Sequence, residues 1–84
     1  MMHPDTLMNL AGLVYCHYVL YVEQRWEGKF KEAKIHLAKA IVYKEQEVEL
    51  KPDATAEDYC ILGQLRLQFT FLKLRMSKRQ REDK

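Results

Sequence analysis

The chain has 84 residues, enough for one small domain, and 14 Lys and Arg against 12 Asp and Glu leave a net charge of +2. A charge this close to neutral gives no argument by itself for nucleic-acid binding. A hydrophobic fraction of 48% excludes a chain that is disordered throughout. A domain of this size buries only about 60–65% of its unfolded surface, so association with a partner is an expected source of further stability.

The first predicted helix, residues 5–26, is apolar around its whole circumference. Residues 7–22 hold thirteen apolar side chains out of sixteen. Two neighbouring helices in so short a chain would leave part of this surface uncovered, so the segment predicts a helix clamped between others or covered by a partner. It falls short of the ~18–20 residues of a membrane span, although its tyrosines leave an interfacial helix as an alternative. Gly28 is placed to end the helix in a left-handed conformation.

The second predicted helix covers residues 29–51 and has the clearest periodicity. Its apolar positions recur at spacings of three and four, which define one helical face. Pro52 ends it, because proline disfavours helical geometry at the residue before it. The residues of this face are Phe30, Ala33, Leu37, Ala40, Ile41, Lys44 and Val48.

The third predicted helix covers residues 56–78, with Thr55 as N-cap and Asp58 three residues on in a capping-box position. Its seam has the 3-4 spacing of a heptad pattern and consists of Leu62, Leu65, Phe69, Leu72 and Met76. Residues 65–71 also alternate with period two, so a strand remains an alternative there. Residues 1–78 are expected to form a single helical domain, and the polar, basic residues 79–84 are expected to form a solvated tail.

The first and third predicted helices contain similar stretches of sequence. Two stretches have the form of the tetratricopeptide-repeat opening, one with Met8, Ala11, Gly12 and Tyr15, the other with Tyr59, Leu62, Gly63 and Arg66. The chain therefore resembles a long tetratricopeptide-like hairpin followed by a third helix, although Gly12 and Gly63 are 51 residues apart and the repeat period is 34. The Gly-x-Phe-x-x-Ala joint at 28–33 is also similar to that of the three-helix MIT domains. Both resemblances imply a protein-binding adaptor, with close helix approach at Gly12, Gly28, Ala33, Ala40 and Gly63.

No catalytic or metal-binding constellation is found in the sequence. Cys16 and Cys60 lie within apolar runs and are predicted to be small buried hydrophobic residues in a reducing, intracellular environment. No pair of cysteines or histidines has zinc-ligand spacing. We expect His17 to form a hydrogen bond in a core or interface, and His36 to lie on an exposed face. The expectations are no enzyme activity, no metal and no cofactor.

Two groups of residues are candidates for binding. Aromatic and aliphatic side chains could contact a protein partner: Tyr15, Tyr18, Tyr21, Trp26, Leu67, Phe71 and Leu74. For Trp26 a second interpretation stays open, in which it plugs the turn between the first two helices with Phe30 beneath it. A late cluster of basic residues could instead meet an acidic protein, phosphates or anionic lipid, or could simply favour the helix C-terminus: Arg66, Lys73, Arg75, Lys78, Arg79 and Arg81.

The sequence thus predicts an all-α fold, with a long antiparallel hairpin and a third helix. The expected function is a non-catalytic protein–protein interaction module, an adaptor, scaffold or chaperone-like subunit, that works through apolar helix faces. We expect self-association or a larger complex, and an intracellular, cytoplasmic location. The alternative is a basic helical domain that docks on nucleic acid or on an anionic membrane. The sequence does not identify the partner or the oligomeric state.

Overall fold

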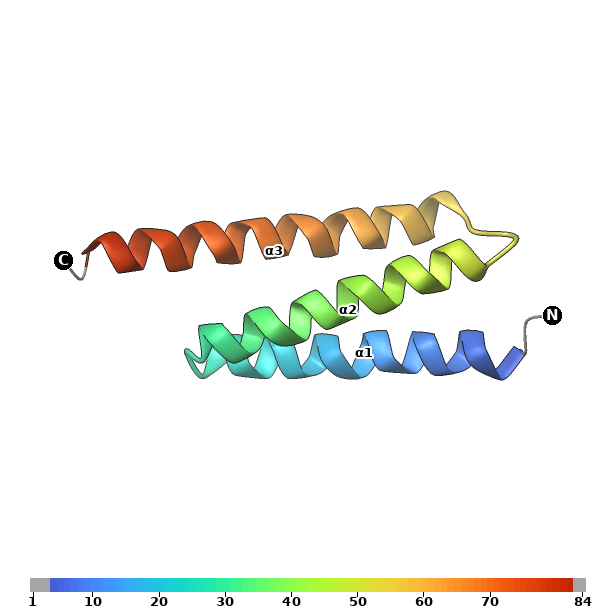
Figure 1. Cartoon of the computed structure of the whole chain (residues 1–84), viewed down its shortest axis with the longest axis horizontal. Helices are drawn as coiled ribbons and strands as arrows, with labels where there is room; N and C mark the ends of the chain where they lie inside the picture. Colours follow the sequence, from blue (N-terminus) through green and yellow to red (C-terminus); the bar gives the residue numbers. More distant parts are fainter. Residues whose placement is uncertain (1–3, 83–84) are drawn as a thin grey trace.

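The computed structural model describes residues 4–82 as three helices: α1 (Pro4–Trp26), α2 (Phe30–Leu50) and α3 (Ala56–Glu82). The all-α fold and the antiparallel α1–α2 hairpin are confirmed. In Figure 1, α2 lies between the other two helices, and α1 and α3 run in the same direction on either side of it. The molecule is elongated, with extents of 53 × 21 × 17 Å. Within residues 4–82, no helix combines the length and the apolar character needed to cross a bilayer.

The alternative of a strand at residues 65–71 is wrong, because this segment is helical and lies within α3. Leu65 and Leu72, seven residues apart, are both buried, as expected for one helical face. The helix also continues to Glu82, four residues beyond the predicted end at 78. No Gly or Pro follows Gly63, and the Lys, Arg and Gln residues near the end are good helix formers.

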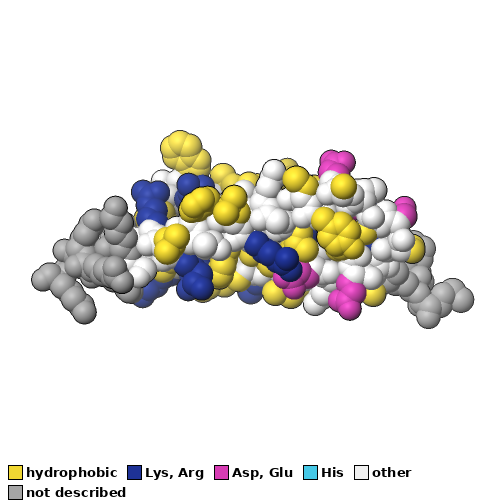
Figure 2. Space-filling model, turned by 90° about the horizontal axis from the view of Figure 1, so that it is seen from above, with side chains coloured by type: hydrophobic (Ala, Val, Ile, Leu, Met, Phe, Trp, Pro, Cys, Tyr) yellow, Lys and Arg dark blue, Asp and Glu magenta, His cyan; other side chains and the backbone are white. Residues whose placement is uncertain are grey.

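Both outer helices pack closely on α2, while their own backbones stay apart. Among the described residues, no Cα atom of α1 lies within 8 Å of one in α3. Of the two predicted alternatives for the first helix, the one in which other helices clamp it is wrong, since α1 is an edge helix with Met8 and Tyr15 exposed. Helix α3 likewise leaves hydrophobic side chains exposed on its outward face, which is seen from above in Figure 2. The apolar surface foreseen in the sequence is thus left uncovered on two helices.

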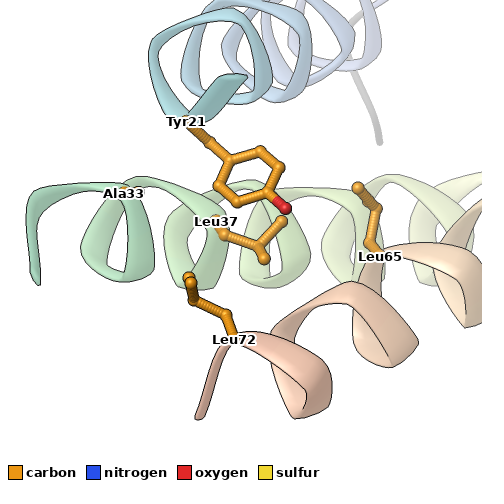
Figure 3. Packing of buried hydrophobic residues seen from close by; sticks show 5 residues of the cluster. All are labelled: Tyr21, Ala33, Leu37, Leu65 and Leu72. Carbon is orange, nitrogen blue, oxygen red and sulfur yellow. The ribbon is translucent and has the colours of Figure 1, made fainter. Parts of the chain in front are cut away.

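The core lies where α1 and α3 meet the buried face of α2. Ala33 and Leu37 of α2 are 0% exposed, and Tyr21 of α1 covers them from one side. Leu65 and Leu72 point from α3 toward the same centre (Figure 3). Because Ala33 is small, the Tyr21 ring and the Leu72 side chain both reach the middle of the three-helix layer. This one cluster joins all three helices.

The turn between α1 and α2 has the predicted glycine geometry. Gly28 has φ +79°, in the left-handed region. The Lys29 N–H donates to the Gln24 carbonyl at 2.8 Å, and the Gly28 N–H donates to the Arg25 carbonyl at 3.2 Å. These two bonds form a Schellman motif, which satisfies carbonyl groups at the end of α1.

The expected close helix approach at glycines is wrong at all three positions. Gly12, Gly28 and Gly63 are exposed, and a Cβ added at any of them would meet no heavy atom within 4 Å. The small residues that lie between helices are instead Ala33 and Ala40, both in α2. The reason is topological: α2 contacts a helix on each side, whereas Gly12 and Gly63 lie on faces of edge helices that no other helix covers.

The three glycines allow a direct comparison of their roles. We expect Gly28→Ala to lower the free energy of unfolding by about 1–2 kcal/mol, because an L-residue is strained at positive φ. Gly12→Ala is the control: it fills open space in a helix interior and should raise stability by about 0.5–1 kcal/mol. Urea denaturation monitored by circular dichroism measures both. Equal effects of the two substitutions would contradict the assigned turn geometry.

Candidate protein-binding groove

An open groove lies between α1 and α3, with α2 as its floor. Its apolar end is a hollow of about 290 Å³. Val14 and Tyr15 line it from α1, and Ile61 and Leu65 line it from α3. The groove exists because the two outer helices are both held on α2 while their backbones stay apart. Its remaining lining residues are Ala11, Tyr18, Lys44, Glu47, Gln64 and Gln68.

A second hollow, of about 480 Å³, lies farther along the same two helices. Tyr18 and Gln68 line both hollows, so the two form one continuous surface, which we call the α1–α3 groove. The second hollow is bounded by Trp26, by Phe30 and by two arginines, Arg25 and Arg75. The groove therefore has an apolar end and a cationic, aromatic end.

The two arginines at the cationic end are bound to aromatic groups. Arg25 donates a hydrogen bond to the Tyr21 hydroxyl at 3.3 Å. The Arg75 guanidinium lies 5.0 Å from the centre of the Phe30 ring, a cation–π contact. Among the residues that the structure describes, no carboxylate forms an ion pair with either arginine. Both charges are therefore available to an acidic group of a partner.

A buried ion-pair network lies at the apolar end. Lys44 of α2 donates to Glu47 at 3.0 Å and to Asp58, in the first turn of α3, at 3.2 Å. All three side chains are buried. Burial opposes the charge on Lys44, but the hydrogen bonds to the two carboxylates outweigh it and raise the pKa of Lys44. The network fixes the end of α2 against the start of α3.

Asp58 also forms the predicted capping box. Its carboxylate accepts from the Thr55 N–H at 3.0 Å, and its own N–H donates to the Thr55 hydroxyl at 3.4 Å. The backbone hydrogen bond from Thr55, followed by the hydrogen bond from Lys44, holds the pKa of Asp58 far below its usual value. Lys51 adds a second cationic contact at 3.3 Å. The joint between α2 and α3 is thus fixed by charge as well as by apolar packing.

A histidine pair joins α1 to α2 on another part of the surface. The Nδ1 atoms of His17 and His36 are 3.1 Å apart, and the ring planes differ by 23°. The ring centroids are 5.3 Å apart, farther than the two Nδ1 atoms. The two nitrogens therefore lie between the rings and point at each other. One Nδ1 must donate and the other accept. His36 is half-buried in this contact, so its predicted place on an exposed face is wrong.

The predicted partner-binding tyrosines take different positions. Tyr15 and Tyr18 line the α1–α3 groove. The sequence alone does not indicate this, because the groove is formed by residues far apart in the chain. Tyr21 is only 2% exposed, so it is a core residue and not a free surface aromatic. Trp26 is 87% exposed, which contradicts the interpretation that it plugs the turn. It stands at the cationic end of the groove instead, while Phe30 packs against the core.

The other candidates lie on α3. Leu67, Phe71 and Leu74 are exposed on its outward face, and Phe71 also borders the groove. Of the described members of the expected basic cluster, Arg66 pairs with Glu45 at 2.9 Å and Lys73 lies over Phe69. Arg75 points to the groove side. For the other predicted members of this cluster, Lys78, Arg79 and Arg81, the structure describes the helical backbone and not the side chains.

The cysteines were predicted to be buried, and this is wrong. Cys16 and Cys60 are both exposed and both free thiols. Each belongs to an outer helix, on a part of the helix that does not face α2. Within the described part of the chain, no three His, Cys, Asp or Glu side chains gather closely enough to hold a metal ion.

Comparison of the chain with protein-family models, with curated proteins and with solved structures finds no match. The class that the structure establishes is a three-helix all-α protein with packed helices.

The histidine pair makes folding stability depend on pH. Partial burial, then the nearby charges of His36 and Lys39, lower the pKa of His17 from 6.5. Tyr43 stacks on the same ring. Unfolded His17 thus binds a proton more readily than folded His17, so the stability present above pH 6.5 should be lost as the pH falls below that value. We expect the melting temperature to decrease between pH 7 and 5.

His17→Asn is the matched variant for this measurement, because it keeps a polar side chain but does not titrate. Its melting temperature should vary less between pH 7 and 5 than that of the parent protein. The separate loss of stability from protonation of Asp58, below its ordinary pKa of 3.8, should remain in both proteins. An unchanged slope in His17→Asn would show that another group is responsible.

Proposed function

We propose that the protein is a non-catalytic protein–protein interaction module that holds a helical segment of a partner in the α1–α3 groove. The observation that carries this proposal is the open groove itself, lined by side chains of two helices whose backbones do not meet. Helices bind in such grooves through apolar side chains at spacings of three and four. An adaptor, scaffold or chaperone-like subunit would use this mode of binding.

The apolar end of the groove would hold the hydrophobic stripe of the partner helix. Tyr15 and Tyr18 stand on one wall and Ile61 and Leu65 on the other. Rigid aromatic side chains beside a hollow are typical anchors of protein interfaces. Gln64 and Gln68 border the hollow and can bind polar groups at the margin of the stripe.

The cationic end would set the direction of the bound helix. A Glu or Asp near one end of the partner segment can reach Arg25 or Arg75, and an arginine can bind a carboxylate with two parallel hydrogen bonds. The exposed Trp26 ring would cover the same end of the partner. The ligand class is therefore an amphipathic helix with acidic residues at one end.

A sequence resemblance supports the binding mode, and the cysteines support the expected location. Binding between helices is what the resemblance to tetratricopeptide hairpins and to MIT domains implies, and the groove offers the surface for it. The two exposed free thiols, Cys16 and Cys60, support an intracellular, reducing location. Self-association through other apolar faces is compatible with an open groove.

A peptide selection tests the groove. From a display library of helical 20-residue peptides with apolar residues at spacings of three and four, we expect enrichment of peptides with Asp or Glu at one end. Tyr15→Ala should weaken binding of an enriched peptide about 10-fold, because it removes an aromatic wall of the hollow. Tyr59→Ala is the control, since Tyr59 is also exposed but does not line the groove. Fluorescence anisotropy of the labelled peptide measures both.

Two outcomes would count against the groove. If no peptide binds more tightly than a scrambled sequence of the same composition, the proposed ligand class is wrong. If binding instead requires only negative charge and is lost steeply with salt, the alternative of nucleic-acid or anionic-membrane binding gains support, because phosphate contacts release counterions.

A further inference from the structure

The outward face of α3 carries an apolar stripe that no part of the described chain covers. Leu67, Phe71 and Leu74 are 54%, 60% and 62% exposed. Cys60 and Gly63 continue the stripe toward the start of the helix, and both are exposed. We call these five residues the outer stripe. Figure 2 shows hydrophobic side chains along this face, with basic side chains toward the C-terminal half of α3 and acidic ones toward the other end.

The spacing of the outer stripe is symmetric about Leu67. Its successive intervals are three, four, four and three residues. At 3.6 residues per turn all five positions fall within an arc of about 80°, so they form one face. The sizes are not symmetric: the two residues before Leu67 are small, and the two after it are large. A symmetric spacing with complementary sizes is what a two-fold axis at Leu67 requires.

We propose that the outer stripe binds the outer stripe of a second copy of this chain, with the two α3 helices antiparallel and the two-fold axis at Leu67. Leu67 then faces Leu67 of the second copy. Phe71 then lies opposite Gly63 of the second copy, in the same layer of the interface. Leu74 lies opposite Cys60 of the second copy in the next layer. Gly63 leaves room for the ring, since a Cβ there would meet no heavy atom within 4 Å.

Charge favours the same register. Glu57 and Arg75 lie on the same side of the outer stripe at opposite ends, 18 residues apart. In an antiparallel two-fold pair, residues on equivalent sides meet, so Glu57 of one copy approaches Arg75 of the other at both ends. Arg66 lies near the axis and would meet its own equivalent, but Glu45 at 2.9 Å neutralises it.

A parallel arrangement fits worse. It would set Phe71 against Phe71 and Gly63 against Gly63, so one layer is crowded and another is empty. It would also keep Glu57 and Arg75 at opposite ends of the pair, 18 residues apart, so their charges could not meet. None of the five residues of the outer stripe lines the apolar end of the α1–α3 groove, although Arg75 beside the stripe also lines its cationic end. The pairing of the outer stripes does not require a bound helix in the groove, so this proposal does not depend on the proposed function.

Sedimentation velocity of the full chain over a concentration series tests the proposal. We expect a monomer–dimer equilibrium, since a single helix pair is at the small end of stable interfaces. Leu67→Glu sets two carboxylates against each other at the axis and should weaken the dimer ~10-fold or more. The control is Ile35→Glu, because Ile35 of α2 is equally exposed, at 54%, and lies outside the outer stripe. A chain that stays monomeric, or a Leu67→Glu dimer as tight as the parent, overturns the proposal.

Gly63→Leu separates association from folding. It fills the space that Phe71 of the second copy needs, while nothing in its own chain lies within 4 Å of the added Cβ. We expect unchanged or higher helical content and melting temperature in dilute solution, together with a dimer weakened ~10-fold or more. A Gly63→Leu dimer of parental affinity contradicts the layer of Phe71 with Gly63.

Disulfide trapping determines the orientation. In a Cys16→Ser background, the Leu74→Cys variant should form an intermolecular disulfide between Cys60 of one copy and the new thiol at position 74 of the other. The Cys16→Ser protein without Leu74→Cys should form little dimer under the same oxidation, because Cys60 faces Leu74 and not its own equivalent. Efficient trapping through Cys60 alone would indicate a parallel pair and overturn the proposal.

Discussion

Helix α2 packs against both other helices, and its completely buried residues set the distances at which they lie. Ala33, Leu37 and Ala40 are 0% exposed, and their small and branched side chains let Tyr21 and Leu72 reach the same centre from two sides. Since the outer helices are both held on α2, their backbones stay apart. The α1–α3 groove, the exposed face of α1 and the outer stripe of α3 all follow from this arrangement.

The buried ion-pair network complements that apolar contact. Lys44, Glu47 and Asp58 are buried together, and each charge has a partner within 3.2 Å. Buried ion pairs often contribute little net stability, because desolvation of the charges opposes their attraction. Their geometry is specific, however, since a shift of α3 along α2 would leave a buried charge unpaired. We infer that this network fixes the register of α3, and with it the residues that face the groove.

Periodicity and local chemistry predicted the helices, but not which faces stay open. The seam of α2, the cap at Thr55 and the turn at Gly28 depend on residues close in sequence, so they could be read directly. Helix α1 is apolar all round, and its sequence therefore does not tell which side meets α2. For this reason Trp26, Cys16 and Gly12 were misplaced. The groove and the pair of His17 with His36 join residues far apart in the chain, which no local pattern indicates.

The absence of backbone contact between α1 and α3 also shapes how the molecule opens. Each outer helix is stabilised mainly by its own interface with α2, as neighbouring units are in a linear array. Release of α3 leaves the α1–α2 interface intact, so this sub-global opening costs less free energy than complete unfolding. Tyr21 is the main link that couples the two interfaces, because it packs with Leu65 and Leu72 as well as with Leu37. The width of the α1–α3 groove therefore depends on whether α3 stays packed on α2.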